Sequence, residues 1–322
     1  MAMDLSYTDG VIAARDKFLL KDKLLRLCEM TAEDAFRTLI ESGFGGGAET
    51  ASSVYDYEKL IEREEALVDA FIREYAPTQA DAAYLLISRD FHNAKALLKA
   101  AYLGESADKL LASEGLIEIS TLKRAVESSD FSALSDYPQL QKACEECAEY
   151  LRGESVSGAT VGQIFQNALF SYLRIVGRKN STLKKLVQAK ADITNILTAL
   201  RKKDGEENLF VAGGKLSKEA LERLASDSEN AAKMPAFEPY KEVIGQCLAA
   251  KEKGLPFTVG EKLLGGYETA YFAARKYDLV RNQPFLYYVL RRRAENANVR
   301  IVFALLLLGL PEHEIKKRLR GV

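Results

Sequence analysis

The sequence is poor in the residues that metal sites and disulfide frameworks require. Its 322 residues include two histidines, His92 and His313, and four cysteines. Neither histidine has a second histidine at metal-ligand spacing. The sequence "EHEI" around His313 also differs from the H-E-x-x-H pattern of zinc hydrolases. Four cysteines in a chain of this length do not form a disulfide framework. We therefore expect no metal, no cofactor and a cytoplasmic setting.

Long apolar runs are also scarce. The longest, "IVFALLLLGL" at 301–310, follows several arginines in the manner of a membrane anchor. Ten helical residues cover only about 15 Å, whereas the hydrocarbon core is about 30 Å thick. Gly309 and Pro311 then end the run, and the N-terminus "MAMDLSYTDG" lacks the basic and apolar pattern of a signal peptide. We expect a buried core helix at 301–310 and no direct bilayer insertion.

An excess of either charge is missing as well. Lys and Arg number 45 against 46 Asp and Glu, which gives a net charge of -1 and a pI near 6.3. Such a balance supplies no overall field for nucleic acid, so charged partners must be recognised locally. Hydrophobic residues make up 48 %, which argues against disorder.

Helical periodicity is what the sequence does contain. In "SSVYDYEKLIEREEALVDAFIREYAP" the apolar residues form one helical stripe that Pro77 closes. Similar stripes predict an all-α chain. The single place for a short hairpin is "NLFVAGGKLS", around Gly213 and Gly214. The further stripes occupy 78–103, 138–152, 159–203, 240–253, 261–278 and 284–308.

A repeat of about a hundred residues is the most informative pattern. An acid-x-x-Asn element occurs three times, its acids 102 and 103 residues apart, and each Asn opens an apolar run that stops at a glycine. The elements are Asp90 with Asn93, Asp192 with Asn195, and Glu295 with Asn298; the stops are Gly104, Gly205 and Gly309. Short helices are then expected to start at Ser120, Ser217 and Pro311, with a weaker fourth start at Thr31.

This period is longer than the 33 to 47 residues of common helical solenoids. We therefore expect three small helical bundles, at 1–88, 89–190 and 191–322. The last copy is truncated at Val322, so the N-terminal helices should cover its open face and close the chain into a compact or ring-like body. The alternative is that helices often contain Asp and end in Gly, which explains each element but not their common spacing.

Catalytic motifs are weak throughout. Cys144 and Cys147 form a C-x-x-C that suits a redox pair, half a zinc site, or two small apolar residues on one helix face. The last interpretation is favoured, because the adjacent glutamates would raise a thiol pKa. "SGFGGGAET" lacks the dinucleotide-binding spacing and "VAGGKLS" lacks the P-loop pattern, so we expect a mobile loop and a hairpin turn.

Two basic clusters remain, and each is either a solvated helix face or a docking surface for an acidic partner. The planar fork of arginine suits carboxylates, which inclines the second cluster towards an interface. The first holds Arg178, Lys179, Lys184 and Lys185 within "RIVGRKNSTLKKLVQAK"; the second holds Arg291, Arg292, Arg293 and Arg300.

These elements together resemble a known family. The acid-x-x-Asn helices, "GGKLS" leading into "LSKEALERL", and the ending "FLYYVLRRRAENANVRIVFALLLLGLPEHEIKKRL" are similar to the C-type central-stalk subunit of V-type and A-type rotary ATPases, which is the d-type subunit of the eukaryotic V-ATPase. The resemblance extends over nearly the whole chain.

The resemblance implies a funnel-shaped, all-α body of three pseudo-threefold-related domains. It implies a non-catalytic rotor subunit on the cytoplasmic face, between the membrane proteolipid ring and the central-shaft subunits of D and F type. In each repeat we expect the Asn amide to bond backbone where helices meet, and the acid to cap a helix or pair with an arginine. A helical adaptor with no rotor role is the alternative of another class, and an enzyme would depend on Cys144 and Cys147 alone.

Overall fold

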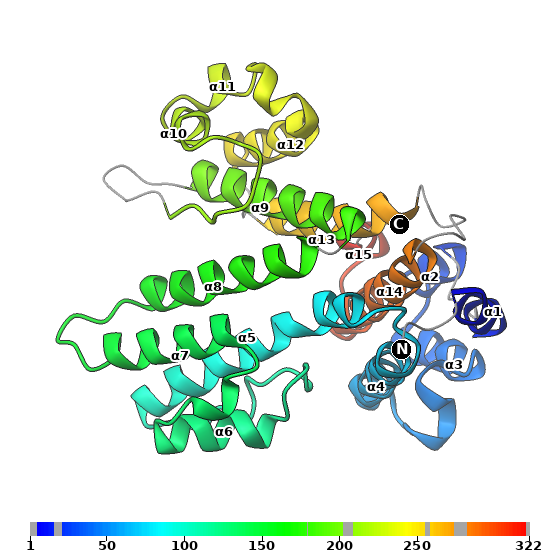
Figure 1. Cartoon of the computed structure of the whole chain (residues 1–322). Coiled ribbons are helices and arrows are strands. Elements are labelled where there is room, and N and C mark those ends of the chain that lie inside the picture. Colours follow the sequence, from blue (N-terminus) through cyan, green and yellow to red (C-terminus); the bar gives the residue numbers. More distant parts are fainter. Residues whose placement is uncertain are drawn as a thin grey trace. The chain divides into compact units, whose positions relative to one another are not determined.

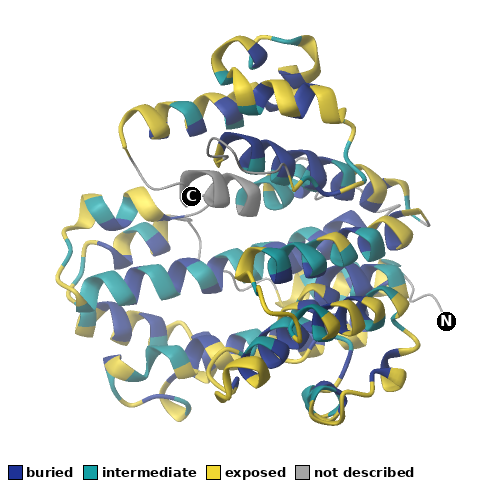
Figure 2. Cartoon of the chain, turned by 90° about the vertical axis from the view of Figure 1, so that its left-hand side faces the viewer, coloured by how far each residue is buried: buried dark blue, intermediate teal, exposed yellow. Residues whose placement is uncertain are grey.

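The computed structural model describes residues 5–15, 21–178, 180–201, 209–254, 258–273 and 282–319. Within these ranges every regular element is an α-helix or a short 3-10 helix, and no strand occurs. The prediction of an all-α chain is confirmed. Figure 2 shows that many of the helices have buried residues along one side and exposed residues along the other, as amphipathic stripes require.

The chain divides into two compact units. Unit 1 joins the two ends of the chain, Met1–Asp81 and Gly265–Val322, and unit 2 is Ala82–Leu264. Two helices, α5 and α13, belong partly to each unit. The division into three repeats at 88/89 and 190/191 stays a prediction.

Unit 1 holds the N-terminal and C-terminal helices. They are α1 (Leu5–Arg15), α2 (Lys21–Leu27), α3 (Ala32–Glu41), η1 (Phe44–Glu49), η2 (Val54–Asp56), α4 (Tyr57–Tyr75), the start of α5 (Gln79–Leu103), the end of α13 (Thr258–Ala273), α14 (Gln283–Leu307) and α15 (Glu312–Arg318).

Unit 2 holds the middle of the chain. Besides most of α5 and the start of α13, it contains α6 (Ile119–Ser128), η3 (Ser132–Leu134), α7 (Pro138–Tyr150), α8 (Gly158–Arg178), α9 (Ser181–Arg201), α10 (Lys218–Ser226), α11 (Ser228–Ala231), η4 (Pro235–Tyr240) and α12 (Lys241–Glu252).

The N-terminal helices cover the last long helix. Helices α1 to α4 all contact α14, with α4 making the most extensive contact (Figure 1). The ring of Phe303 on α14 packs against Phe36 at 6.3 Å and Tyr57 at 5.5 Å between centroids, inside the main core of unit 1. The expectation that the N-terminal helices cover the last long helix is confirmed.

The apolar run at 301–310 is part of this core. Val302 and Phe303 are fully buried, and Leu305, Leu306 and Leu307 pack against the same cluster. Leu308 is the exception, since its side chain is largely exposed. Across the described residues, none of the helices has the length and hydropathy needed to span a bilayer.

The three long helices that carry acid-x-x-Asn begin at equal intervals. Helices α5, α9 and α14 start at Gln79, Ser181 and Gln283, 102 residues apart. The preceding residues are polar: the Thr78 hydroxyl and the Asn180 side-chain oxygen each accept from backbone N–H groups of the first turn. Asn282 departs from this role, because its amide donates to the Asp81 carboxylate on α5. The period is thus present in the helix boundaries as well as in the motif.

One predicted stripe is wrong in its extent. The sequence at 159–203 reads as one helical stretch, but the structure breaks it into α8 and α9. Asn180 starts α9, and a Cβ placed on Gly177 would lie 3.2 Å from Cα of Lys184, so the two helices meet closely at this corner. A capping Asn and a small residue produce a break that apolar periodicity does not detect.

The glycine stops and helix starts are mostly as expected. Gly104 and Gly309 follow α5 and α14 with φ of 69° and 70°, the left-handed conformation that ends helices. Gly205 lies outside the described residues. Ser217 caps α10 and Thr31 caps α3 through their hydroxyls. The start predicted at Ser120 is wrong, since α6 begins at Ile119.

The predicted hairpin is also wrong. No strand occurs at 209–217 in the described chain. The backbone N–H groups of Val211, Lys215 and Leu216 bond to side chains on α9 instead of to a second strand. The residues "LFV" favour extended backbone, but Val211 bonds to the side chain of Asn195 on α9 and not to a neighbouring strand.

The glycine-rich segment is a packed turn, and the expectation of a mobile loop is wrong. Phe44, Gly45 and Gly47 are buried, and η1 contacts both α3 and α4. The N–H of Gly45 donates to Glu64 Oε1 at 2.9 Å. Only a residue without Cβ lets this backbone lie directly on α4.

We expect Gly45→Ala to destabilise unit 1 far more than Gly43→Ala. Both glycines have positive φ, 59° and 76°, but a Cβ on Gly45 would lie 2.3 Å from the Leu60 carbonyl oxygen, whereas one on Gly43 meets nothing within 4 Å. Gly43→Ala should cost about 1 kcal/mol from backbone strain, and Gly45→Ala about 3 kcal/mol or more because helix α4 must shift. Urea unfolding measures both, and equal losses would contradict the packing described here.

Candidate functional site

The asparagines of the first two acid-x-x-Asn elements each hold a loop to their own helix. The amide of Asn195 donates to Val211 O at 2.9 Å and accepts from Val211 N at 2.8 Å. Asn93 forms the same pair of bonds with Ala112, at 3.2 and 2.8 Å. A side-chain amide has one donor side and one acceptor side, so it can bind a single backbone residue as a neighbouring strand would.

The acids complete the arrangement four residues further along each loop. Asp192 Oδ1 accepts from the N–H groups of Lys215 and Leu216 at 2.8 and 2.9 Å. Both carboxylate oxygens of Asp90 are used likewise, accepting from Leu116 at 2.7 Å and Ile117 at 3.1 Å. Each acid thus binds backbone N–H groups that lie just before the next helix, α6 or α10, and neither of these two acids has an arginine partner among these bonds. We call each such set of bonds an Asp-Asn bracket.

Two further residues of the bracket were missed from the sequence. A Cβ on Gly115 would lie 2.2 Å from Asp90 Oδ2, and one on Gly214 would lie 2.1 Å from Asp192 Oδ1. Because glycine has no Cβ, the carboxylate can approach the backbone N–H groups of the residues that follow each glycine. Gly115 and Gly214 are 99 residues apart, and this spacing is the signal that could have identified them.

A tyrosine hydroxyl binds one of the two buried carboxylates, and another tyrosine senses the charge of the other. The hydroxyl of Tyr240 donates to Asp192 Oδ2 at 2.7 Å. Burial raises the pKa of Tyr137, and the nearby charge of Asp90 raises it further. Tyr137 and Tyr240 are 103 residues apart, which again matches the repeat. Each bracket therefore includes a glycine, and the bracket of Asp192 also includes a tyrosine hydroxyl.

The third copy uses different chemistry. Glu295 accepts from Arg292 Nη1 at 2.7 Å, and Arg292 Nη2 forms a second ion pair with Glu64 on α4. Asn298 is buried on the same helix. Helix α15 begins at Glu312, soon after α14 ends, so no long loop is available for a bracket. Here the acid does pair with an arginine.

The arginines of α14 are engaged within unit 1. Arg300 Nε donates to both oxygens of Glu58 at 3.0 and 3.1 Å, and Arg293 lies 3.8 Å from Asp69. Only 12 % of the Arg292 side chain is exposed. These bonds connect α14 to the acidic side of α4, so the geometry gives Arg292 and Arg300 a structural use that the sequence did not reveal. Arg291 is half-buried.

The other basic cluster is arranged differently. Arg178, Lys184 and Lys185 are all exposed at the corner between α8 and α9, and Lys179 lies outside the described residues. In the described part of the chain, no ion pair includes any of these three cations, which contrasts with the arginines of α14. An interface there stays a prediction, and the surface is open to one.

The cysteines lack the surroundings of a reactive thiol. Cys144 and Cys147 are both buried on α7 and both free. Burial raises the pKa of Cys144 to about 12 and that of Cys147 to about 11. Thiols at such pKa values are protonated at neutral pH, which makes them poor nucleophiles. Among the described residues, no three His, Cys, Asp or Glu side chains gather as a metal site would need.

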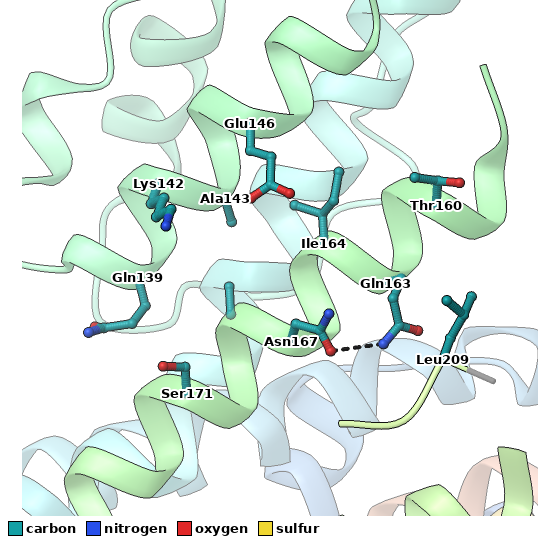
Figure 3. A pocket seen from close by; sticks show the side chains of 11 residues that line it. Gln139, Lys142, Ala143, Glu146, Thr160, Gln163, Ile164, Asn167, Ser171 and Leu209 are labelled. Carbon is teal, nitrogen blue, oxygen red and sulfur yellow. Dashed lines mark hydrogen bonds between the residues drawn. The ribbon is translucent and has the colours of Figure 1, made fainter. Parts of the chain in front are cut away.

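A groove of about 490 Å³ lies between α7 and α8 in unit 2 (Figure 3). Three carboxamides border it, from Gln139, Gln163 and Asn167, and Gln163 donates to Asn167 at 2.8 Å. Lys142 and Glu146 are its charged lining residues. One cation beside one anion gives the lining of this groove no net charge.

Comparison with known proteins identifies the chain's relatives. A family model described as the ATP synthase (C/AC39) subunit matches residues 11–318, which include parts of both units. Among curated proteins, a search found no match to the chain.

We expect Asn195→Leu to lower the free energy of unfolding by about 2 to 3 kcal/mol, because it leaves the buried N–H and C=O of Val211 unsatisfied. The matched control is Asn167→Leu on the exposed side of α8, which should change stability by less than about 0.5 kcal/mol. Denaturant titration of both variants tests the bracket. Equal stability of the two variants would show that the amide bonds contribute nothing.

Arg292→Met should destabilise unit 1 by about 3 kcal/mol, because two buried glutamates lose their common cation. Arg37→Met is the control: Arg37 pairs with Asp34, but its side chain is 70 % exposed, so the loss should be under about 0.5 kcal/mol. The same denaturant titration applies, repeated at high salt. A loss for Arg292→Met that disappears in salt would mean that this pair behaves as a surface ion pair.

Proposed function

Because the chain belongs to the ATP synthase (C/AC39) subunit family, we propose that it is a non-catalytic rotor subunit that links the central shaft to the membrane proteolipid ring and transmits torque. Members of this family are subunits of rotary ATPases, so the partners of the chain are subunits of that complex. The family match over residues 11–318 is the observation that carries the proposal.

The internal bonding supports the mechanical part of this role. A body that transmits torque must resist shear between its helices. The Asp-Asn brackets fix the loops after α5 and α9, and the buried pairs of Arg292 join α14 to α4. These bonds are directional and buried, so they oppose sliding more strongly than apolar packing alone.

The remaining chemistry supports a subunit that does not catalyse. The thiol pKa values are raised by burial, and the α7–α8 groove has an amide border with balanced charge. ATP hydrolysis or synthesis would then belong to other subunits. On this proposal the chain lies at the cytoplasmic face of the membrane, held there by the ring, and meets D-type and F-type shaft subunits at its other interface.

We expect the full-length chain, tagged and used as bait in a mild-detergent membrane extract, to retain proteolipid and shaft subunits together. Arg37→Met, an exposed substitution, serves as the folded control and should retain the same partners. Mass spectrometry of the bound fraction identifies them. Recovery of soluble proteins without proteolipid or shaft subunits would favour a helical adaptor with no rotor role.

A further inference from the structure

The corner between α8 and α9 lies in a stretch of chain without acidic residues. No aspartate or glutamate occurs between Glu154 and Asp192, although that stretch contains six lysines and arginines. In a chain whose charges otherwise balance, this is a strong local excess. Its effect depends on whether other elements neutralise it, and the structure answers that question for the described residues.

The cations converge at one place. Arg174 and Arg178 lie one turn apart at the end of α8, while Lys184 and Lys185 lie near the start of α9. The close approach of Gly177 to Lys184 brings the two helix ends together. Ile175, between the arginines in sequence, is 42 % exposed. We call Arg174, Ile175, Arg178, Lys184 and Lys185 the basic corner.

The positive charge of the basic corner is not compensated within the described chain. All four cations are exposed, and none of them takes part in an ion pair there. The first turn of α9 contains no acid, and the amino end of a helix is itself partially positive. Two lysines at this end therefore add to a positive potential, which favours a polyanionic partner.

We propose that the basic corner docks on the surface of an anionic phospholipid bilayer. Guanidinium and ammonium groups bind headgroup phosphates, and Ile175 enters the interfacial layer beneath them. A carboxylate-rich protein surface fits less well, because it would place this apolar side chain against charged groups. The contact is with headgroups and needs no spanning helix. It goes beyond the proposed rotor role, since it involves lipid and not another subunit.

Flotation of the full-length chain with protein-free vesicles tests the proposal. Binding should be strong to vesicles of phosphatidylcholine with about 30 mol% phosphatidylserine, and weak to phosphatidylcholine alone. It should also weaken as salt rises to about 0.5 M. Lys184→Glu with Lys185→Glu should lower the partition coefficient at least about tenfold. Ile175→Ser, which keeps every charge, should lower it by about two- to fivefold.

The matched control is Lys218→Glu with Lys241→Glu, the same charge change at two exposed lysines elsewhere in unit 2. This control should bind as the unmodified chain does. If both double variants lose vesicle binding equally, the effect comes from the net charge of the chain and the basic corner is not a specific binding surface. Vesicle binding by Lys184→Glu with Lys185→Glu that equals that of the unmodified chain would also overturn the proposal. The vesicles contain no ATPase subunits, so failure here leaves the rotor proposal untouched.

Discussion

A buried carboxylate or amide must find hydrogen-bonding partners inside the protein, and the arrangement of this chain follows from that constraint. Asp90, Asn93, Asp192 and Asn195 are almost completely inaccessible to water on α5 and α9. Leaving such groups unsatisfied is costly. Their partners are backbone groups at 112–117 and 211–216, so the polar residues hold in place two described segments that have no regular structure of their own.

The third copy meets the same constraint with a different partner. Helix α15 begins five residues after the end of α14, so no long loop between these two helices returns to Glu295. Arg292 fills this need, and the same guanidinium also pairs with Glu64 on α4. The N–H of Gly45 bonds to the other oxygen of Glu64, which draws the glycine-rich turn into the same network. The two ends of the chain are thereby joined into unit 1 by a polar contact between residues more than two hundred positions apart.

Burial also separates two clusters that look alike in sequence. Both are short runs of arginine and lysine on helices. The arginines of α14 pair with acids of α4 and stabilise the fold, whereas the described cations of the α8–α9 corner form no ion pair with any described acid. A cluster of charged residues in the sequence does not by itself indicate a binding surface. Exposed charged side chains that form no ion pair within the protein are better candidates for one. A rotor role and a lipid contact both require exposed surface, and the cations of the α8–α9 corner are exposed.

Much of this protein follows from local pattern alone. Apolar periodicity predicts the helices, glycine and capping residues predict most of their ends, and the spacing of Asp90, Asp192 and Glu295 reveals the repeat. The ending "NVRIVFALLLLGLPEHEI" indicates the family. These properties are local or periodic, so they can be recognised from the amino-acid sequence alone. The bracket glycines, the tyrosine that binds Asp192, the break at Asn180, and the acids that face Arg292 and Arg300 required the tertiary structure. Their partners are distant in the chain, and only folding decides which polar groups meet and which remain at the surface.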